Sequence, residues 1–231
     1  MQRQQLSNRK KKNNKSNLLV HLNPKSIIQE QYHAMRANLQ PKLNEKGIKT
    51  LVITSCEELE GKSTTAANLA IAFSEVGKKV LLIDADLREP TIHHSFMVSN
   101  NIGLSDILCE RHSIKGSIQP SNVTNLDILT SGQVPSKPSE LLGSQTMEEF
   151  IFKIREDYDL IIFDSPPTLT VADPIILANI CDSVLLVVRS DANNSENVET
   201  TRDMLLNTKA YFHGAVLNGA FRNKRKKRRK V

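Results

Sequence analysis

Residues 50–76 contain a strand pattern, a loop and a helix pattern in succession, and this order constrains the fold more than any other part of the chain. Thr50 to Thr54 is apolar and β-branched, as in a strand, and Ser63 to Ser74 is rich in alanine, as in a helix. The loop between them ends in Glu60-Gly61-Lys62-Ser63-Thr64. The backbone N–H groups and the positive dipole end at such a helix start attract a polyphosphate. The pattern therefore predicts a phosphate-binding P-loop.

Two later apolar runs each end in a carboxylate, Leu81 to Asp84 and Leu160 to Asp164. Parallel strands of an open α/β sheet carry their ligand-binding groups at their carboxyl ends. We therefore expect Asp84, Asp86 and Asp164 beside the P-loop. Each motif alone is common, because a strand-end aspartate is often only a helix cap. Their combination predicts a site for Mg²⁺ and a nucleotide.

Within the predicted P-loop, Lys62 would reach the β- and γ-phosphates, and the Ser63 hydroxyl would bind Mg²⁺. The loop departs from the standard G-x-x-x-x-G-K-[ST] pattern, because Cys56 stands at its first position and 57–60 contains three carboxylates and no glycine. Leu59 at positive φ would cost about 1–2 kcal/mol. We expect ATP binding to persist with reduced affinity.

The length of 231 residues suits one α/β domain. No run of about 18 apolar residues suggests a membrane span, and the N-terminal residues lack the apolar segment of a secretory signal, so the cytosol is the expected compartment.

The cysteines, Cys56, Cys109 and Cys181, are too widely spaced for a disulfide framework or a zinc site. We therefore expect buried or incidental thiols. Cys56 is the expected exception, because a thiol beside Lys62 and a helix start can have a lowered pKa and be open to oxidation.

Positive charge is concentrated near the two ends of the chain. Residues 1–15 contain six Lys or Arg, residues 222–230 contain eight, and the segment between them is net acidic. We therefore divide the chain into a basic arm at 1–20, a P-loop domain at 21–221 and a polybasic tail at 222–231. Such segments are usually solvated, and they bind anionic lipid, nucleic acid or acidic protein surfaces.

Apolar strand patterns alternate with helical patterns along the rest of the chain. This alternation predicts an α/β fold of the P-loop NTPase type, with a mostly parallel sheet and helices on both faces. Residues 86–99 are expected to form a loop, with a short helix after Gly103. The other expected strands are 49–55, 79–84, 126–130, 159–164, 183–189 and 212–217, and the other expected helices are 26–39, 62–76, 139–142, 146–156, 173–180 and 196–208.

Several motifs resemble those of the cytosolic bacterial tyrosine kinases of capsule and exopolysaccharide biosynthesis, which are themselves similar to MinD/ParA-like P-loop ATPases. The resemblance covers about residues 20–220. The most specific motif is Asp84-Ala85-Asp86-Leu87-Arg88-Glu89-Pro90, and Asp164-Ser165-Pro166-Pro167 resembles a Walker B segment. Three further segments also resemble the family: Leu129 to Gly132, Pro138 to Leu142, and Leu217-Asn218.

The resemblance implies transfer of the ATP γ-phosphate to a tyrosine hydroxyl, with ATP and Mg²⁺ as cofactors. It implies that Asp84 or Asp86 accepts the tyrosine proton, and that Arg88 either clamps phosphate or pairs with a carboxylate. The implied catalytic residues are Lys62, Asp84, Asp86 and Asp164; the implied nucleotide-binding residues are Glu60, Gly61, Lys62, Ser63, Thr64 and Arg88; and the implied metal-binding residues are Ser63, Asp84 and Asp164.

The resemblance also implies a homo-oligomeric ring. In the family, this ring is assembled through an N-terminal helix that carries the pattern Glu-x-x-Arg-x-x-Arg. Here the corresponding residues are Glu30, His33 and Arg36, so one arginine is replaced by a histidine whose charge depends on pH near neutrality. An ordinary amphipathic helix with surface charges is the alternative interpretation.

A second departure from the family is the absence of a C-terminal tyrosine cluster, because the chain ends in KRKKRRKV. The tyrosines are Tyr32, Tyr158 and Tyr211, and we expect the last two to be core or edge residues rather than phosphate acceptors. Either phosphorylation is directed at tyrosines of other proteins, or the chain has little kinase activity and works through ATP-linked assembly.

The leading hypothesis is a tyrosine kinase that works with a membrane adaptor protein at the inner face of the plasma membrane, where the basic tails contact anionic lipid. The alternative is a MinD/ParA-like ATPase switch without kinase activity. That group usually has a lysine near the start of its loop, where Glu57 stands here, and this difference favours the kinase. A nucleic-acid-binding module ranks last, because the body is acidic and aromatic residues are few, so no specific nucleic acid is expected.

Overall fold

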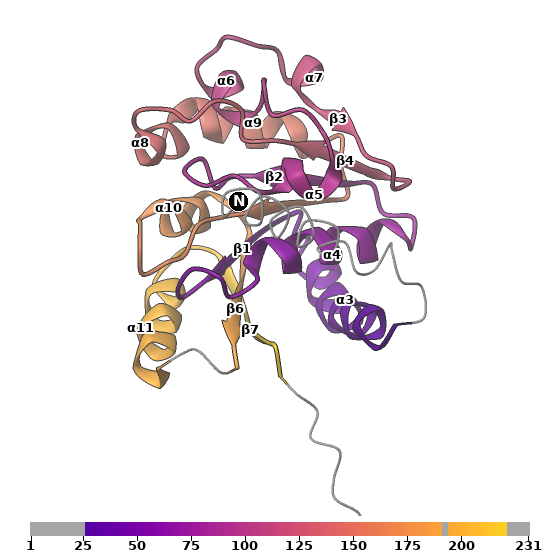
Figure 1. The fold of residues 1–231 in the computed structure, drawn as a ribbon, viewed down its shortest axis with the longest axis vertical. Coiled ribbons are helices and arrows are strands. Elements are labelled where there is room, and N and C mark those ends of the chain that lie inside the picture. The colour runs from indigo at the N-terminus through magenta and orange to yellow at the C-terminus, as the bar shows by residue number, and fades with distance from the viewer. Residues whose placement is uncertain (1–25, 191–193, 221–231) are drawn as a thin grey trace, which may run out of the picture.

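A computed structural model describes residues 26–190 and 194–220 as a seven-stranded sheet with strand order β3-β4-β2-β5-β1-β6-β7 (Figure 1). All neighbouring strands are parallel except β3 and β4. The predicted mostly parallel sheet is therefore confirmed. The strands are β1 Thr50–Ser55, β2 Val80–Asp84, β3 Gln119–Pro120, β4 Leu126–Leu129, β5 Leu160–Asp164, β6 Ser183–Arg189 and β7 Tyr211–Asn218.

Helices cover both faces of this sheet, as the sequence predicted (Figure 1). Leu51 and Ile53 of β1 pack on the face that α3 and α4 cover, and Val52 packs on the face of α9, α10 and α11. This alternation follows from the period of two along a strand. The helices are α3 Ile27–Glu45, α4 Lys62–Ser74, α5 Ile92–Phe96, α6 Leu104–Leu108, α7 Ile114–Ser117, α8 Pro138–Leu142, α9 Gln145–Ile154, α10 Asp173–Ile180 and α11 Ser195–Leu206. None of these helices is long and apolar enough to cross a membrane.

The strand order brings the predicted phosphate-handling segments to one edge of the sheet. β5 lies between β1 and β2, and Asp84 is the register partner of Asp164. The P-loop leaves the carboxyl end of β1 at the same edge and leads into α4. Three segments far apart in sequence therefore meet because their strands are neighbours and point in the same direction.

One predicted helix end and one predicted loop are wrong. The helix expected at 26–39 continues to Glu45 through Pro41, because the added turn buries Leu43 against the sheet, which offsets much of the roughly 3 kcal/mol that an internal proline costs. The loop expected at 86–99 contains α5, whose first backbone N–H groups donate to the buried carboxylate of Asp84. The short helix α7 and the strand β3 were also not predicted.

The basic arm predicted at residues 1–20 and the polybasic tail predicted at 222–231 lie outside the described residues.

At the opposite edge of the sheet, the Asp182 carboxylate joins the starts of β1 and β6. Its Oδ2 accepts hydrogen bonds from the backbone N–H groups of Lys49, at 2.8 Å, and Thr50, at 2.9 Å. Its Oδ1 accepts one from Arg155 Nη1 at 2.8 Å. Partial burial raises the pKa of Asp182, but the hydrogen bonds from Arg155, Lys49 and Thr50 outweigh it, so the pKa is lowered overall.

We predict that Asp182→Asn lowers the free energy of unfolding by about 1–3 kcal/mol at pH 7, because hydrogen bonds to a charged acceptor are replaced by weaker ones. The folded state lowers this pKa, so the stabilisation is complete above the unfolded-state pKa of about 4 and is lost as the pH falls through the folded-state pKa. Urea unfolding at pH 7 and pH 3 measures both effects.

Asp203→Asn is the matched control, because Asp203 pairs with Arg202 on the surface and its side chain is 60% exposed. This control is expected to change the unfolding free energy by less than about 0.5 kcal/mol. A loss for Asp182→Asn that is equally large at pH 3 would contradict the assigned role of the carboxylate charge.

Leu59, at the tip of the P-loop, has the left-handed conformation that the sequence suggested. Its φ is 61° and its side chain is largely exposed. The residue therefore carries backbone strain without gaining much from burial.

We predict that Leu59→Gly raises the free energy of unfolding by about 0.5–1 kcal/mol, since relief of the strained φ exceeds the entropy that a glycine loses on folding. The control is Leu217→Gly, at an exposed leucine of strand β7, which should lower the unfolding free energy. Chemical denaturation of both variants measures the effect. Equal destabilisation by the two changes would show that Leu59 is not strained.

Candidate nucleotide-binding site

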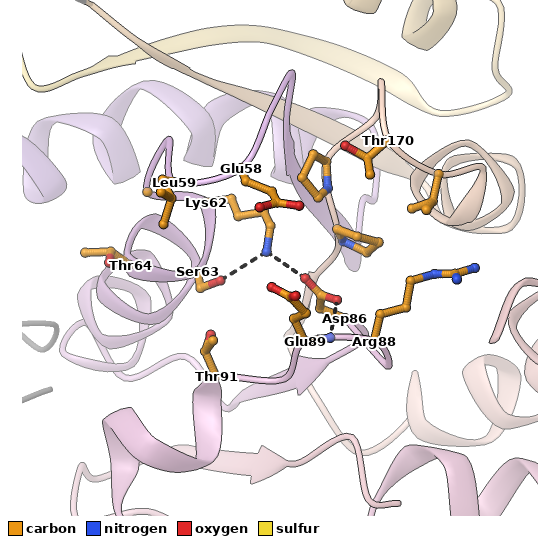
Figure 2. A pocket seen from close by; sticks show the side chains of 14 residues that line it. Glu58, Leu59, Lys62, Ser63, Thr64, Asp86, Arg88, Glu89, Thr91 and Thr170 are labelled. Atoms are coloured by element: carbon orange, nitrogen blue, oxygen red, sulfur yellow. Dashed lines mark hydrogen bonds and ion pairs between the residues drawn. The ribbon is translucent and has the colours of Figure 1, made fainter. Parts of the chain in front are cut away.

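A cavity of about 510 Å³ opens at the carboxyl edge of the sheet (Figure 2). Its walls come from the P-loop, the segment after β2 and the segment after β5, which are the three segments that the sequence singled out. The cavity is of the size that small-molecule sites have. Its lining residues are Glu58, Leu59, Gly61, Lys62, Ser63, Thr64, Asp86, Arg88, Glu89, Thr91, Pro166, Pro167, Thr170 and Val171.

Gly61 forms the N-terminal boundary of α4 with a φ of 90°, a conformation that glycine adopts readily. A Cβ atom at this position would collide with the side-chain amide of Asn218. That amide donates a hydrogen bond of 2.8 Å to the backbone carbonyl of Glu60. Asn218, which the sequence marked only as part of a familial segment, therefore holds the P-loop from the end of β7.

Lys62 points across the cavity toward Asp86 (Figure 2). Its Nζ lies 2.8 Å from Asp86 Oδ2 and 3.4 Å from Ser63 Oγ. Burial lowers the pKa of Lys62, but the charges of Asp164 and Asp86 outweigh burial and raise the pKa overall. Lys62 is therefore a charged ammonium directed at the centre of the cavity.

Asp84 and Asp164 are fully buried next to each other, and their charges are incompletely compensated. Both oxygens of Asp164 and Oδ1 of Asp84 have no hydrogen-bond partner among the residues described. Burial raises the pKa of Asp164 to about 6, although the charge of Lys62 opposes this shift. Burial and the charge of Asp164 raise the pKa of Asp84 well above its usual value.

These unpartnered buried oxygens fit a bound cation. Within residues 26–190 and 194–220, no cluster of three His, Cys, Asp or Glu side chains forms a complete metal site. Magnesium usually takes only one or two carboxylates and completes its shell with water and substrate phosphates. Asp164 and Ser63, close to a phosphate-binding loop, are consistent with that chemistry.

Arg88 pairs with a carboxylate, which is one of the two alternatives that the sequence left open. Its Nε donates to Asp173 Oδ2 at 2.9 Å, while the side chain still borders the cavity. Asp173 lies at the start of α10, 85 residues further along the chain, and the sequence did not identify it as a partner.

Fewer P-loop carboxylates face the cavity than the sequence suggested. Glu60 is buried, and its Oε2 accepts a hydrogen bond from the backbone N–H of Cys56, so this side chain does not line the cavity. Glu57 accepts a hydrogen bond from Asn197. Glu58 alone among the loop carboxylates borders the cavity.

The expectation for Cys56 is wrong. Its side chain is buried, and this burial raises the pKa of the thiol rather than lowering it. A buried thiol with a raised pKa is not readily oxidised.

The N-terminal helix α3 packs on α4 through two of the residues that the ring interpretation singled out. Arg36 Nη1 donates to the Ala72 carbonyl at 2.7 Å, and His33 Nε2 lies 2.7 Å from Glu75 Oε2. Glu30 is exposed. Both interactions are within one chain, so they support the interpretation of α3 as an amphipathic helix and leave assembly untested.

The tyrosine side chains are buried or partly buried in the fold. Tyr32 and Tyr158 are buried, and the Tyr158 hydroxyl donates to Asp127 Oδ2 at 2.9 Å. Tyr211 is partly buried at the start of β7. The prediction that Tyr158 and Tyr211 are core or edge residues is therefore confirmed.

The chain is similar to proteins of known fold and activity. The model of the AAA domain family matches residues 48–210. The tyrosine-protein kinase YwqD of Bacillus subtilis is 43% identical over 203 residues, which cover 88% of this chain and 86% of that protein. The putative tyrosine-protein kinase CapB of Staphylococcus aureus is 38% identical over 90% of this chain and 92% of its own length.

Solved structures agree with these relatives. The kinase domain of the Escherichia coli tyrosine kinase ETK superposes with a TM-score of 0.86 and 33% identity, covering 90% of this chain and 82% of that one. The septum site-determining protein MinD of Pyrococcus horikoshii, solved with Mg-ADP, superposes with a TM-score of 0.64 and 25% identity over 73% of this chain and 69% of its own. The chain therefore belongs to the bacterial tyrosine kinases, a family with the MinD-like P-loop NTPase fold.

Proposed function

We propose that this chain transfers the γ-phosphate of ATP to tyrosine hydroxyls of other proteins and thereby regulates capsule or exopolysaccharide biosynthesis. The observation that carries this proposal is the convergence of Lys62, Ser63 and Asp86 in one cavity, above the buried pair Asp84 and Asp164. The tyrosine kinases among the relatives favour this activity over a MinD/ParA-like switch.

In this proposal the backbone of residues 60–64 binds the phosphates, and Lys62 stabilises the negative charge that moves during transfer. Ser63 and Asp164, together with Asp84, would hold Mg²⁺, which would neutralise phosphate charge there. Thr64 lies in the first turn of α4, where its backbone adds to the positive end of the helix.

Asp86 is the better candidate for the group that accepts the tyrosine proton. Its carboxylate borders the cavity, whereas Asp84 is fully buried and uses one oxygen to bind the first turn of α5. In the structure Asp86 pairs with Lys62. Binding of phosphates would draw the Lys62 ammonium toward them, which leaves the Asp86 carboxylate available as a base.

The acceptor tyrosines belong to other proteins in this proposal, because the tyrosines of the chain itself are buried or partly buried. Regulation by a membrane adaptor and assembly into a ring through Glu30, His33 and Arg36 remain further parts of the proposal. Arg36 uses Nη1 for the Ala72 carbonyl, and a guanidinium has five N–H donors, so ring assembly through α3 would use its other N–H groups or replace this contact.

We predict that Lys62→Met abolishes phosphotransfer, with a loss of at least about 100-fold, because the charge facing the transferred phosphoryl group disappears. The measurement uses purified chain, labelled ATP, Mg²⁺ and a tyrosine-containing protein substrate, with and without the cytoplasmic segment of a candidate adaptor. Phosphotyrosine formed by the wild-type chain supports the kinase, and phosphate release without phosphotyrosine supports the ATPase switch.

Lys79→Met is the matched control, because Lys79 lies over the Tyr158 ring, outside the set of residues that line the cavity. It should retain phosphotransfer within about twofold of the wild-type rate. Unchanged phosphotransfer by a folded Lys62→Met variant would refute the proposed site.

We further propose that the polybasic segment 222–230 attracts the chain to the anionic inner face of the plasma membrane. Each Lys or Arg near such a surface contributes about 1 kcal/mol before screening by salt. The expected result is sedimentation with vesicles that contain anionic lipid, and a loss of sedimentation at high salt or in a chain that ends at Phe221. Binding that is indifferent to lipid charge or to this truncation would exclude the proposal.

A further inference from the structure

Arg88 is held at the edge of the cavity by two residues that do not line it, Asp173 and Ser139. The Asp173 carboxylate is fully buried and accepts hydrogen bonds from Arg88 Nε at 2.9 Å and from Nη2 at 3.3 Å. Nη2 also donates to the Ser139 hydroxyl at 2.9 Å, and that hydroxyl donates to Asp173 Oδ1. Two sides of the guanidinium are therefore fixed.

The remaining nitrogen, Nη1, has no hydrogen-bond partner in the part of the chain that the structure describes. The Arg88 side chain is 39% exposed and borders the cavity. In Figure 2 the side chain extends away from Lys62, and Asp86 lies between the two. In that view (Figure 2) the Arg88 side chain thus lies beyond Asp86, the proposed proton acceptor, as seen from Lys62.

A tyrosine that gives its proton to Asp86 must approach the γ-phosphate in line, from the side opposite to the leaving group. In the proposed phosphotransfer, the residues next to that tyrosine would pass along the wall that Arg88 forms with Pro167, Thr170 and Val171, which line the cavity. On this wall Arg88 carries the positive charge. Glu58 and Glu89, which also border the cavity, would repel an acidic group placed near them.

We propose that Arg88 binds a carboxylate next to the acceptor tyrosine, and that Ser139 and Asp173 are positioning residues for Arg88. This inference rests on the proposed tyrosine phosphotransfer, and it identifies the substrate class as tyrosines with an acidic neighbour. An arginine fixed by two partners loses little side-chain entropy when it binds a third group, and its contact with a carboxylate is charge-assisted.

The test measures binding of two fluorescent tyrosine peptides to the full chain, with Mg²⁺ and a non-hydrolysable ATP analogue present. The peptides are identical except for a Glu or a Gln next to the tyrosine. We expect the wild-type chain to prefer the Glu peptide by about three- to tenfold. Arg88→Gln should abolish this preference and Ser139→Ala should reduce it, and Ser139→Ala, outside the cavity lining, should bind the ATP analogue within about twofold of wild type.

Arg155→Gln is the matched control, because Arg155 makes the same kind of pair with Asp182, at 2.8 Å, at the opposite edge of the sheet. It should retain the wild-type preference even if it lowers stability. Arg88→Lys keeps the charge without the planar fork, so a partial preference is expected. The ratio between the two peptides reports recognition, and a purely structural role of Arg88 would leave this ratio unchanged.

Three results would overturn the inference: equal binding of the two peptides by wild type, no binding of either peptide, or weaker binding of the ATP analogue by Arg88→Gln with an unchanged peptide ratio. The last result would assign Arg88 to the nucleotide. A wild-type chain that shows the Arg88-dependent preference but forms no phosphotyrosine would retain the carboxylate site while the proposed phosphotransfer fails. The two proposals are therefore tested separately.

Discussion

Two buried carboxylates, Asp84 and Asp164, lie side by side at the carboxyl edge of the sheet, and the site is organised around their charge. Burial of a charge is unfavourable unless an opposite charge or hydrogen bonds compensate it. Lys62 supplies part of that compensation, and its position depends on the P-loop and on the start of α4. The buried pair therefore links the strand order, the loop and the helix into one electrostatic unit, which a cation and phosphates complete.

Aspartate side chains have opposite environments at the two ends of the parallel strands. At the amino edge, Asp182 receives hydrogen bonds from Lys49, Thr50 and Arg155, and its pKa is lowered despite burial. At the carboxyl edge, burial raises the pKa of Asp164, and its oxygens lack partners among the described residues. A carboxylate with satisfied oxygens stabilises the fold. A carboxylate with unsatisfied oxygens lowers stability but remains available to ligands, as is common at functional sites.

The sequence predicted the parallel sheet and the three segments of the cavity because their signals are local. Buried parallel strands appear as continuous apolar runs, and the P-loop is one contiguous motif. Features that depend on tertiary contacts were not predictable in this way. Helix α5 depends on the Asp84 carboxylate, and Arg88 depends on Asp173, 85 residues away. Cys56 was misjudged because closeness to Lys62 in sequence does not reveal that the thiol is buried.

The contact between Asn218 and the P-loop has a consequence for the order in which the site forms during synthesis. The loop at Glu60 and Gly61 leaves the ribosome early, whereas the residue that secures its carbonyl ends the last strand of the sheet. Until β7 has paired with β6, the loop lacks this hydrogen bond and the steric boundary that excludes a Cβ at Gly61. A nascent chain that has not yet released strand β7 therefore lacks one of the contacts that hold its P-loop in place, and this contact forms only when β7 has joined the sheet.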